Sequence, residues 1–134
     1  MAADAVFEFT PDPNSSAQAR LLASEWASGL DHDLVFALEL VVSELVTNAI
    51  RHGVAPITMT LSDTDEGIRV EVHDHGYGRP TPRVASARAP GGRGLRLISR
   101  LSSSWGIDST PPVGGKTVWA LVPVPAMRTQ TAGR

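Results

Sequence analysis

Residues 34–53 have the sequence LVFALELVVSELVTNAIRHG, and the helical period of this segment is the starting point for assigning the fold. Asp31 and Asp33 are candidate N-cap residues before it, and Gly53 is a candidate stop after it. Apolar residues recur at the i, i+4, i+7 spacing of an amphipathic helix: Leu34, Leu38, Val41, Val42, Leu45 and Ala49. We therefore expect a long helix at 34–52 with one face against a core.

The residues before this helix predict a strand and a shorter helix. Residues 6–10 alternate weakly between apolar and polar side chains and end at Pro11, which favours a short strand and a turn. Residues 14–16 (Asn, Ser, Ser) offer N-caps for a helix that Gly29 would stop. The expected apolar positions of this helix have near-helical spacing: Ala17, Leu21, Leu22, Trp26 and Leu30.

The residues after the long helix predict most of a sheet. Residues 57–62 and 68–73 alternate with a period of two, and the polar segment 63–67 between them predicts a hairpin loop. The remaining elements are a short helix marked by Leu95, Ile98 and Leu101, a strand at 105–108 and a strand at 117–122. The last strand is apolar on both faces, so we expect it inside the sheet.

Composition limits the class of protein. The 134 residues are 42% hydrophobic and 19% charged, which is typical of one globular domain and excludes a disordered chain. No apolar run reaches the roughly 18 residues of a membrane helix, and MAADAVFEFT at the start lacks the features of a signal peptide. The absence of cysteine excludes disulfides, thiolate zinc sites and a cysteine nucleophile. We expect one domain at 1–127, a flexible tail at 128–134 and a cytoplasmic location.

Charge is distributed unevenly along the chain. Residues 1–78 hold thirteen of the fourteen acids, whereas residues 79–100 hold six arginines and no acid. This basic segment would attract an anion, and a nucleoside triphosphate is the sharpest candidate. A solvated basic face is the alternative, and nucleic acid is less favoured because no aromatic residues interleave with the arginines. The Gly-, Pro- and Arg-rich part, 79–93, is a candidate lid.

Two polar residues flank the apolar stripe of the long helix. At about 100° per residue, Asn48 lies about 20° from Val41, and Glu44 lies about 60° from it. An acid and an amide at i, i+4 beside a buried face suggest a functional pair, because a desolvated carboxylate is costly unless it is paired or used. An ordinary exposed Glu beside a helix-side Asn is the alternative interpretation.

An acid also continues the buried register of a strand. Asp74 follows Ile68, Val70 and Val72 at the same two-residue spacing, and Gly76 and Gly78 after it permit a tight turn and close approach of a ligand. A simple turn is the alternative. His73 and His75 could ligate a metal with Asp74, but no further ligands cluster nearby in the sequence. His52 lies on the apolar stripe and is interpreted as a packing residue.

Common phosphate-binding and hydrolase motifs are absent or incomplete. Residues 115–117 (GKT) resemble the end of a P-loop, but Thr110 stands where its first glycine belongs and a strand follows. Thr81 likewise replaces the third glycine of a dinucleotide fingerprint, and no Gly-x-Ser-x-Gly elbow occurs. Gly91 to Gly94 before the Leu95 helix can still bind phosphate through free amides, with a helix cap or a flexible loop as alternatives.

Four segments in this order resemble the GHKL nucleotide-binding superfamily: ELVTNAIRHG at 44–53, DHGYG at 74–78, GRGL at 92–95 and GKT at 115–117. Within it, the short chain resembles the anti-sigma-factor serine/threonine kinases. The resemblance implies a Bergerat fold, an α/β (α+β) two-layer sandwich whose mixed β-sheet has helices on one face. The abbreviated glycine box and the three prolines of the lid depart from the family pattern.

The resemblance also implies roles for individual residues. Asn48 would bind Mg²⁺, Asp74 would accept a hydrogen bond from adenine, and Glu44 would be the general base. The other residues implied in nucleotide binding are Gly76, Gly78, Gly92, Arg93, Gly94, Leu95 and Thr117, the last of which would support the adenine end.

The function implied is that of an ATP- and Mg²⁺-dependent protein serine/threonine kinase and anti-sigma factor. Its partners would be a sigma factor and an anti-sigma-factor antagonist protein, which it would phosphorylate to regulate transcription. A homodimer is compatible with this interpretation, and neither membrane nor direct nucleic-acid binding is expected. The alternative is a nucleotide-binding interaction module without significant phosphotransfer.

Overall fold

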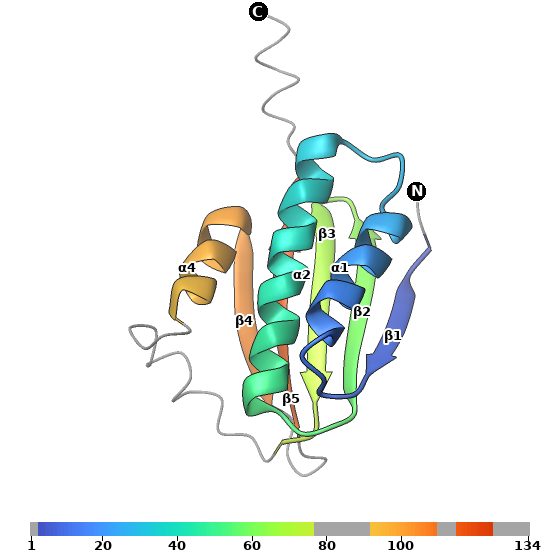
Figure 1. Cartoon of the computed structure of the whole chain (residues 1–134). Helices are drawn as coiled ribbons and strands as arrows, with labels where there is room; N and C mark the ends of the chain where they lie inside the picture. Colours follow the sequence, from blue (N-terminus) through green and yellow to red (C-terminus); the bar gives the residue numbers. More distant parts are fainter. Residues whose placement is uncertain (1–2, 77–91, 110–114, 125–134) are drawn as a thin grey trace, which may run out of the picture.

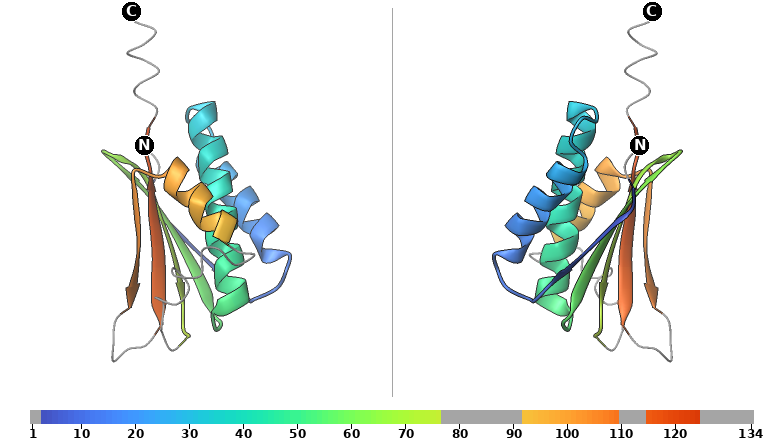
Figure 2. Two further views of the ribbon diagram at one scale, coloured as in Figure 1. Left: turned by 90° about the vertical axis from the view of Figure 1, so that its left-hand side faces the viewer. Right: turned by 90° about the vertical axis from the view of Figure 1, so that its right-hand side faces the viewer.

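The computed structural model describes residues 3–76, 92–109 and 115–124, which form a sheet covered by helices on one face (Figure 1). The strands are β1 (Ala5–Phe9), β2 (Ile57–Thr64), β3 (Gly67–Asp74), β4 (Ser104–Ser109) and β5 (Lys116–Val122). The helices are α1 (Ser15–Trp26), α2 (His32–His52) and α4 (Gly92–Leu101). The three helices lie on the same side of the sheet when it is viewed from either edge (Figure 2).

The sheet has the order β1-β2-β3-β5-β4. Its four strand pairings are antiparallel, where a mixed sheet was expected. The predicted class, an α+β sandwich with helices on one face, is confirmed. As predicted, β5 lies inside the sheet, between β3 and β4.

Strand periodicity determines which side chains meet the helices. Ile57, Met59 and Leu61 of β2 are buried, and the threonines between them are only half-buried. In β3 the glycine at its start permits a tight hairpin turn, because Gly67 has φ of +133°. The alternating residues of each strand thus form one apolar face for the core, as the period of two predicts.

The long helix is the centre of the core. Asp31 caps α2 by accepting hydrogen bonds from the backbone N–H groups of Asp33 and Leu34, at 2.8 and 3.1 Å. The predicted apolar stripe is buried, together with Val46. His52 is exposed in the last turn of the helix, so its interpretation as a packing residue was wrong.

The first helix packs differently from the sequence prediction. Ala17 is exposed and Leu21 is 58% exposed, whereas Ala19, Ala23 and the following Ala27 are fully buried. Alanine lets α1 approach α2 closely, and larger side chains such as Trp26 flank this contact half-buried. The prediction is confirmed for Leu22, Trp26 and Leu30, which pack half-buried against the core, and it was wrong for Ala17 and Leu21.

No helix in the part of the chain that the structure describes is long and apolar enough to cross a membrane. The predicted tail at 128–134 and residues 79–91 of the predicted lid lie outside the described residues.

Candidate functional site

Asp74 is a buried acid at the end of β3, with 1% of its surface exposed. It continues the buried register of Ile68, Val70 and Val72, as the sequence predicts. Its Oδ1 atom accepts hydrogen bonds from the backbone N–H of Gly76 at 2.8 Å and that of Val54 at 3.4 Å. These donors offset part of the cost of removing a carboxylate from water.

The other oxygen of Asp74 pairs with Lys116, the only lysine of the chain. The Nζ atom of Lys116 lies 2.8 Å from Oδ2 of Asp74, and the two side chains are 6% and 1% exposed. The two residues are also direct partners in the register between β3 and β5. Asp74 therefore has a cation and two backbone donors around one buried carboxylate.

Sequence reasoning missed Lys116, although the pattern contained the signal. Val118, Ala120 and Val122 are the buried residues of β5, and Lys116 lies in the same register two residues earlier. Because the two strands are antiparallel, the first residue of β5 lies opposite the last residue of β3. The two-residue register of Lys116 can be read from the sequence, but the position opposite Asp74 follows only from the strand pairing.

Three glycines bring other backbone segments against Asp74. A Cβ atom at Gly53, the C-cap of α2, would lie 2.6 Å from Cγ of Asp74, and one at Gly76 would lie 3.0 Å from its Oδ1. A Cβ at Gly115 would press on the backbone oxygen of Asp74, and Gly115 has a φ of +84° that L side chains rarely adopt. A side chain at any of these three positions would come too close to Asp74, so glycine allows the backbone to pack directly against the acid.

Glu44 and Asn48 are half-buried on α2, the helix whose C-cap packs against Asp74. Asn48 precedes Gly53 by five residues, which corresponds to about 7–8 Å along a helix axis, and Glu44 lies about 6 Å farther away. The structure thus places both residues on the element that packs against β3 and β5. Their chemical roles remain predictions.

The glycine-rich segment before the short helix is part of that helix. The backbone of Gly92–Leu95 forms the first turn of α4, which packs against α2. The first amides of a helix have no acceptor within it, so this turn offers N–H donors suited to an anion. α4 lies beside α2 on the helical face of the sheet, and its first turn is at the end toward the C-terminus of α2 (Figure 1). Gly78 lies outside the described residues.

Thr117 lies on the opposite face of the sheet from Asp74. Strand alternation turns the side chain of Thr117 away from that of Lys116, and its Oγ1 atom is 2.9 Å from Nδ1 of His73. His73 in turn has an edge-to-face ring contact with His75 at 4.9 Å between centroids. Lys116, and not Thr117, is therefore the residue of β5 beside the acid, and the role of Thr117 at the adenine end stays a prediction.

The two histidines do not belong to a metal cluster within the described ranges. Residues 3–76, 92–109 and 115–124 contain no group of three or more His, Cys, Asp or Glu side chains that could hold a metal ion. This histidine pair lies on the open face, which is the face of the sheet opposite the helices. Its position is explained by the ring contact between His73 and His75 and by the hydrogen bond with Thr117.

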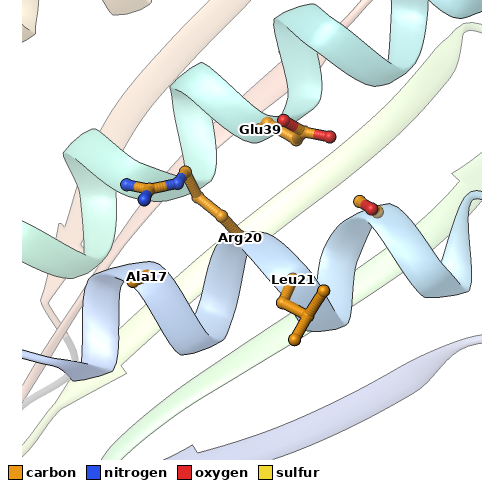
Figure 3. Close-up of a pocket in the computed structure, with 5 residues that line it drawn as sticks. Ala17, Arg20, Leu21 and Glu39 are labelled. Atoms are coloured by element: carbon orange, nitrogen blue, oxygen red, sulfur yellow. The ribbon is translucent and has the colours of Figure 1, made fainter.

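A hollow of about 250 Å³ between α1 and α2 is separate from these residues. It is lined by Ala17, Arg20, Leu21, Ser24 and Glu39, and Figure 3 shows Arg20 of α1 extending toward α2. Arg20 donates a hydrogen bond to Ser43 Oγ at 3.2 Å. None of the predicted site residues lines this hollow.

The chain is similar to known proteins in sequence and in structure. The model of the family described as the histidine kinase-like ATPase domain matches residues 9–121. A solved histidine kinase domain from the blue-light activated histidine kinase of Erythrobacter litoralis EL346 is 26% identical, with a TM-score of 0.53. The match covers 75% of this chain and 49% of that chain, so the chain spans about half the length of that relative. No curated protein matches it.

Proposed function

The chain belongs to the family of histidine kinase-like ATPase domains, and on this premise we propose that it is an ATP- and Mg²⁺-dependent protein serine/threonine kinase. Membership makes the chain a kinase-like domain of the ATP-binding GHKL type. The finer proposal is that it is an anti-sigma factor and phosphorylates an anti-sigma-factor antagonist protein on a serine. This part is supported by the motif resemblance.

One observation carries the proposal. Asp74 is buried at the end of β3, and the backbone at three glycines packs closely against it. The C-cap of the helix that bears Glu44 and Asn48 is one of these contacts. A buried carboxylate of this kind is suited to accept a hydrogen bond from the base of a nucleotide. An exposed acid in a turn would not distinguish one nucleotide base from another. The carboxamide oxygen of Asn48 is a hard oxygen ligand of the type that Mg²⁺ prefers. The residues present therefore fit a nucleotide with magnesium.

Each residue would contribute one function to phosphoryl transfer. Asp74 would accept a hydrogen bond from the 6-amino group of adenine, and the amides of Gly92 and Gly94 would donate to phosphate oxygens. Asn48 would hold magnesium, which neutralises phosphate charge when bound. Glu44 would accept the proton of the attacking serine hydroxyl as the new Oγ–P bond forms and the bond from phosphorus to the leaving ADP oxygen breaks.

Paired calorimetry and transfer assays test these roles. We expect Glu44→Ala to bind ATP with Mg²⁺ within about threefold of the wild type and to transfer no labelled phosphate to a purified antagonist protein, because it removes a base and not a ligand. Asn48→Ala should lose the magnesium dependence of ATP binding. Glu39→Ala is the matched control, since Glu39 is also a half-buried acid on α2 but lies at the hollow toward α1.

Two results would contradict the proposal in different ways. If Asn48→Ala binds ATP with an unchanged response to Mg²⁺, the metal role of Asn48 is wrong. If the wild type binds ATP but labels none of the antagonist proteins of its own organism, the chain is a nucleotide-binding interaction module, as in the alternative from the sequence.

A further inference from the structure

We propose that Lys116 determines base specificity, by donating a hydrogen bond to N1 of adenine beside the acceptor Asp74. This inference rests on the proposed function, because it assumes that Asp74 receives the 6-amino group. It adds a residue that the motif resemblance did not assign to the site. The argument depends on the geometry of the buried pair of Asp74 and Lys116.

The pair presents an acceptor and a donor next to each other. The Nζ atom of Lys116 lies 2.8 Å from Oδ2 of Asp74. The 6-amino group and N1 of adenine are likewise an adjacent donor and acceptor on one edge of the base. A base whose amino group bonds to Asp74 therefore brings N1 toward the ammonium group of Lys116.

Both groups have hydrogen-bonding capacity left for a base. An ammonium group has three N–H donors, and the bond to Asp74 uses one of them. A carboxylate has about four lone-pair sites, and Gly76, Val54 and Lys116 use three. One acceptor site of Asp74 thus remains for the amino group, and Lys116 has donors for N1.

The alternative donor is on the other face of the sheet. Thr117 is the residue that the motif resemblance implied at the adenine end, but its hydroxyl contacts His73 and its strand position turns it away from Asp74. Lys116 is one residue earlier and points into the buried face. The acid can therefore be supported by Lys116 and not by Thr117.

Burial makes this contact selective. Asp74 is 1% exposed and Lys116 is 5% exposed, so a base can reach them only if the covering residues move. Once water is excluded, a base that leaves either group without a hydrogen-bond partner binds more weakly, because an unsatisfied buried polar group costs free energy. Adenine satisfies both groups, whereas a base with a carbonyl at position 6 would face the carboxylate with an acceptor.

Nucleotide analogues test the inference on the wild-type protein. We expect 1-deaza-ATP, in which a C–H group replaces N1, to bind at least about tenfold more weakly than ATP. The matched control is 7-deaza-ATP, which keeps N1 and should bind within about threefold of ATP. Calorimetry gives all three affinities, and the protein needs no substitution.

Labelling the lysine attributes the effect to one residue. Because Lys116 is the only lysine, protein grown with ε-¹³C-lysine gives one side-chain NMR signal. ATP and 7-deaza-ATP should shift this signal to a common position, and saturating 1-deaza-ATP should leave it nearer the free position. Lys116→Met should lower ATP affinity and reduce the ratio of ATP to 1-deaza-ATP affinity to near one. Arg69→Met, a loss of one cation on the open face, should leave the ratio unchanged.

The outcomes separate this inference from the proposed function. If the wild type binds none of the three triphosphates, the proposed function fails and the inference fails with it. If ATP and 1-deaza-ATP bind equally and give the same lysine signal, nucleotide binding stands and the role of Lys116 is overturned. An unfolded Lys116→Met variant would not change this decision, because the analogue and NMR comparisons use the wild type.

Discussion

The backbone carbonyl of Asp74 packs against Gly115, and only glycine leaves room for this contact. Gly115 has φ of +84° and no room for a Cβ beside the backbone oxygen of Asp74. Gly29 has a similar φ of +94°, but nothing lies within 4 Å of the position of its Cβ. A substitution at Gly29 would therefore lose stability through backbone conformation alone, whereas one at Gly115 would also clash with Asp74.

We expect Gly115→Ala to lower the free energy of unfolding by at least about 3 kcal/mol, because it combines a left-handed conformation with overpacking. Gly29→Ala should cost only about 1–2 kcal/mol, since it meets the conformational cost alone. Urea denaturation of both variants measures the difference. Equal losses of stability would show that the backbone around Asp74 yields to a methyl group without strain.

At the scale of single elements, the two long helices differ in how they begin. The Asp31 side chain accepts hydrogen bonds from two backbone amides at the start of α2. Asn14 is the N-cap residue of α1, but its side chain makes no cap hydrogen bond. Candidate N-cap residues were predicted for both helices. The sequence does not show which side chain forms the capping hydrogen bonds, because this depends on the backbone angles at the cap.

Replacement of the two cap residues tests this difference. Asp31→Ala should lower the free energy of unfolding by about 1 kcal/mol, because two amide donors lose their acceptor. Asn14→Ala should change it by less than about 0.5 kcal/mol. Thermal or urea unfolding followed by circular dichroism compares them. A loss at Asn14 as large as that at Asp31 would contradict the assigned cap geometry.

The helices also show what the sequence can and cannot predict. The buried face of α2 was predicted because large aliphatic residues line it without interruption. In α1 the predicted Leu22 and Trp26 do pack against the core, but the fully buried Ala19, Ala23 and Ala27 were not predicted. Small residues carry a weak hydrophobic signal, and their burial depends on how closely the neighbouring helix approaches. Periodicity alone therefore cannot identify such a face.

At the scale of the whole molecule, the site combines residues from distant parts of the chain. The acid at Asp74 and the polar pair Glu44 and Asn48 were predicted from their positions beside apolar patterns. Lys116 was not, because its pairing with Asp74 depends on the order of β3 and β5 in the sheet. Antiparallel pairing joins residues 42 positions apart, and no local pattern specifies it.

Nucleotide binding should stabilise the whole folded molecule. A ligand that binds only the folded state raises the free energy of unfolding by about 2.7 kcal/mol at one hundred times its Kd. We expect ATP with Mg²⁺ to raise the melting temperature, and GTP at equal concentration to have much less effect. A thermal-shift titration with and without Mg²⁺ measures both. Equal shifts with ATP and GTP would contradict adenine recognition at Asp74.

Among the strands that the structure describes, β1 and β4 are at the two edges of the sheet, and each has one side that pairs with no described strand. Exposed strand edges can add strands from neighbouring molecules and so promote aggregation. Here both edge strands are short, with five and six residues, and each carries an exposed acid, Glu8 or Asp108. Short, charged edges disfavour intermolecular strand pairing, so the protein should stay dispersed at the high concentrations that calorimetry and NMR require.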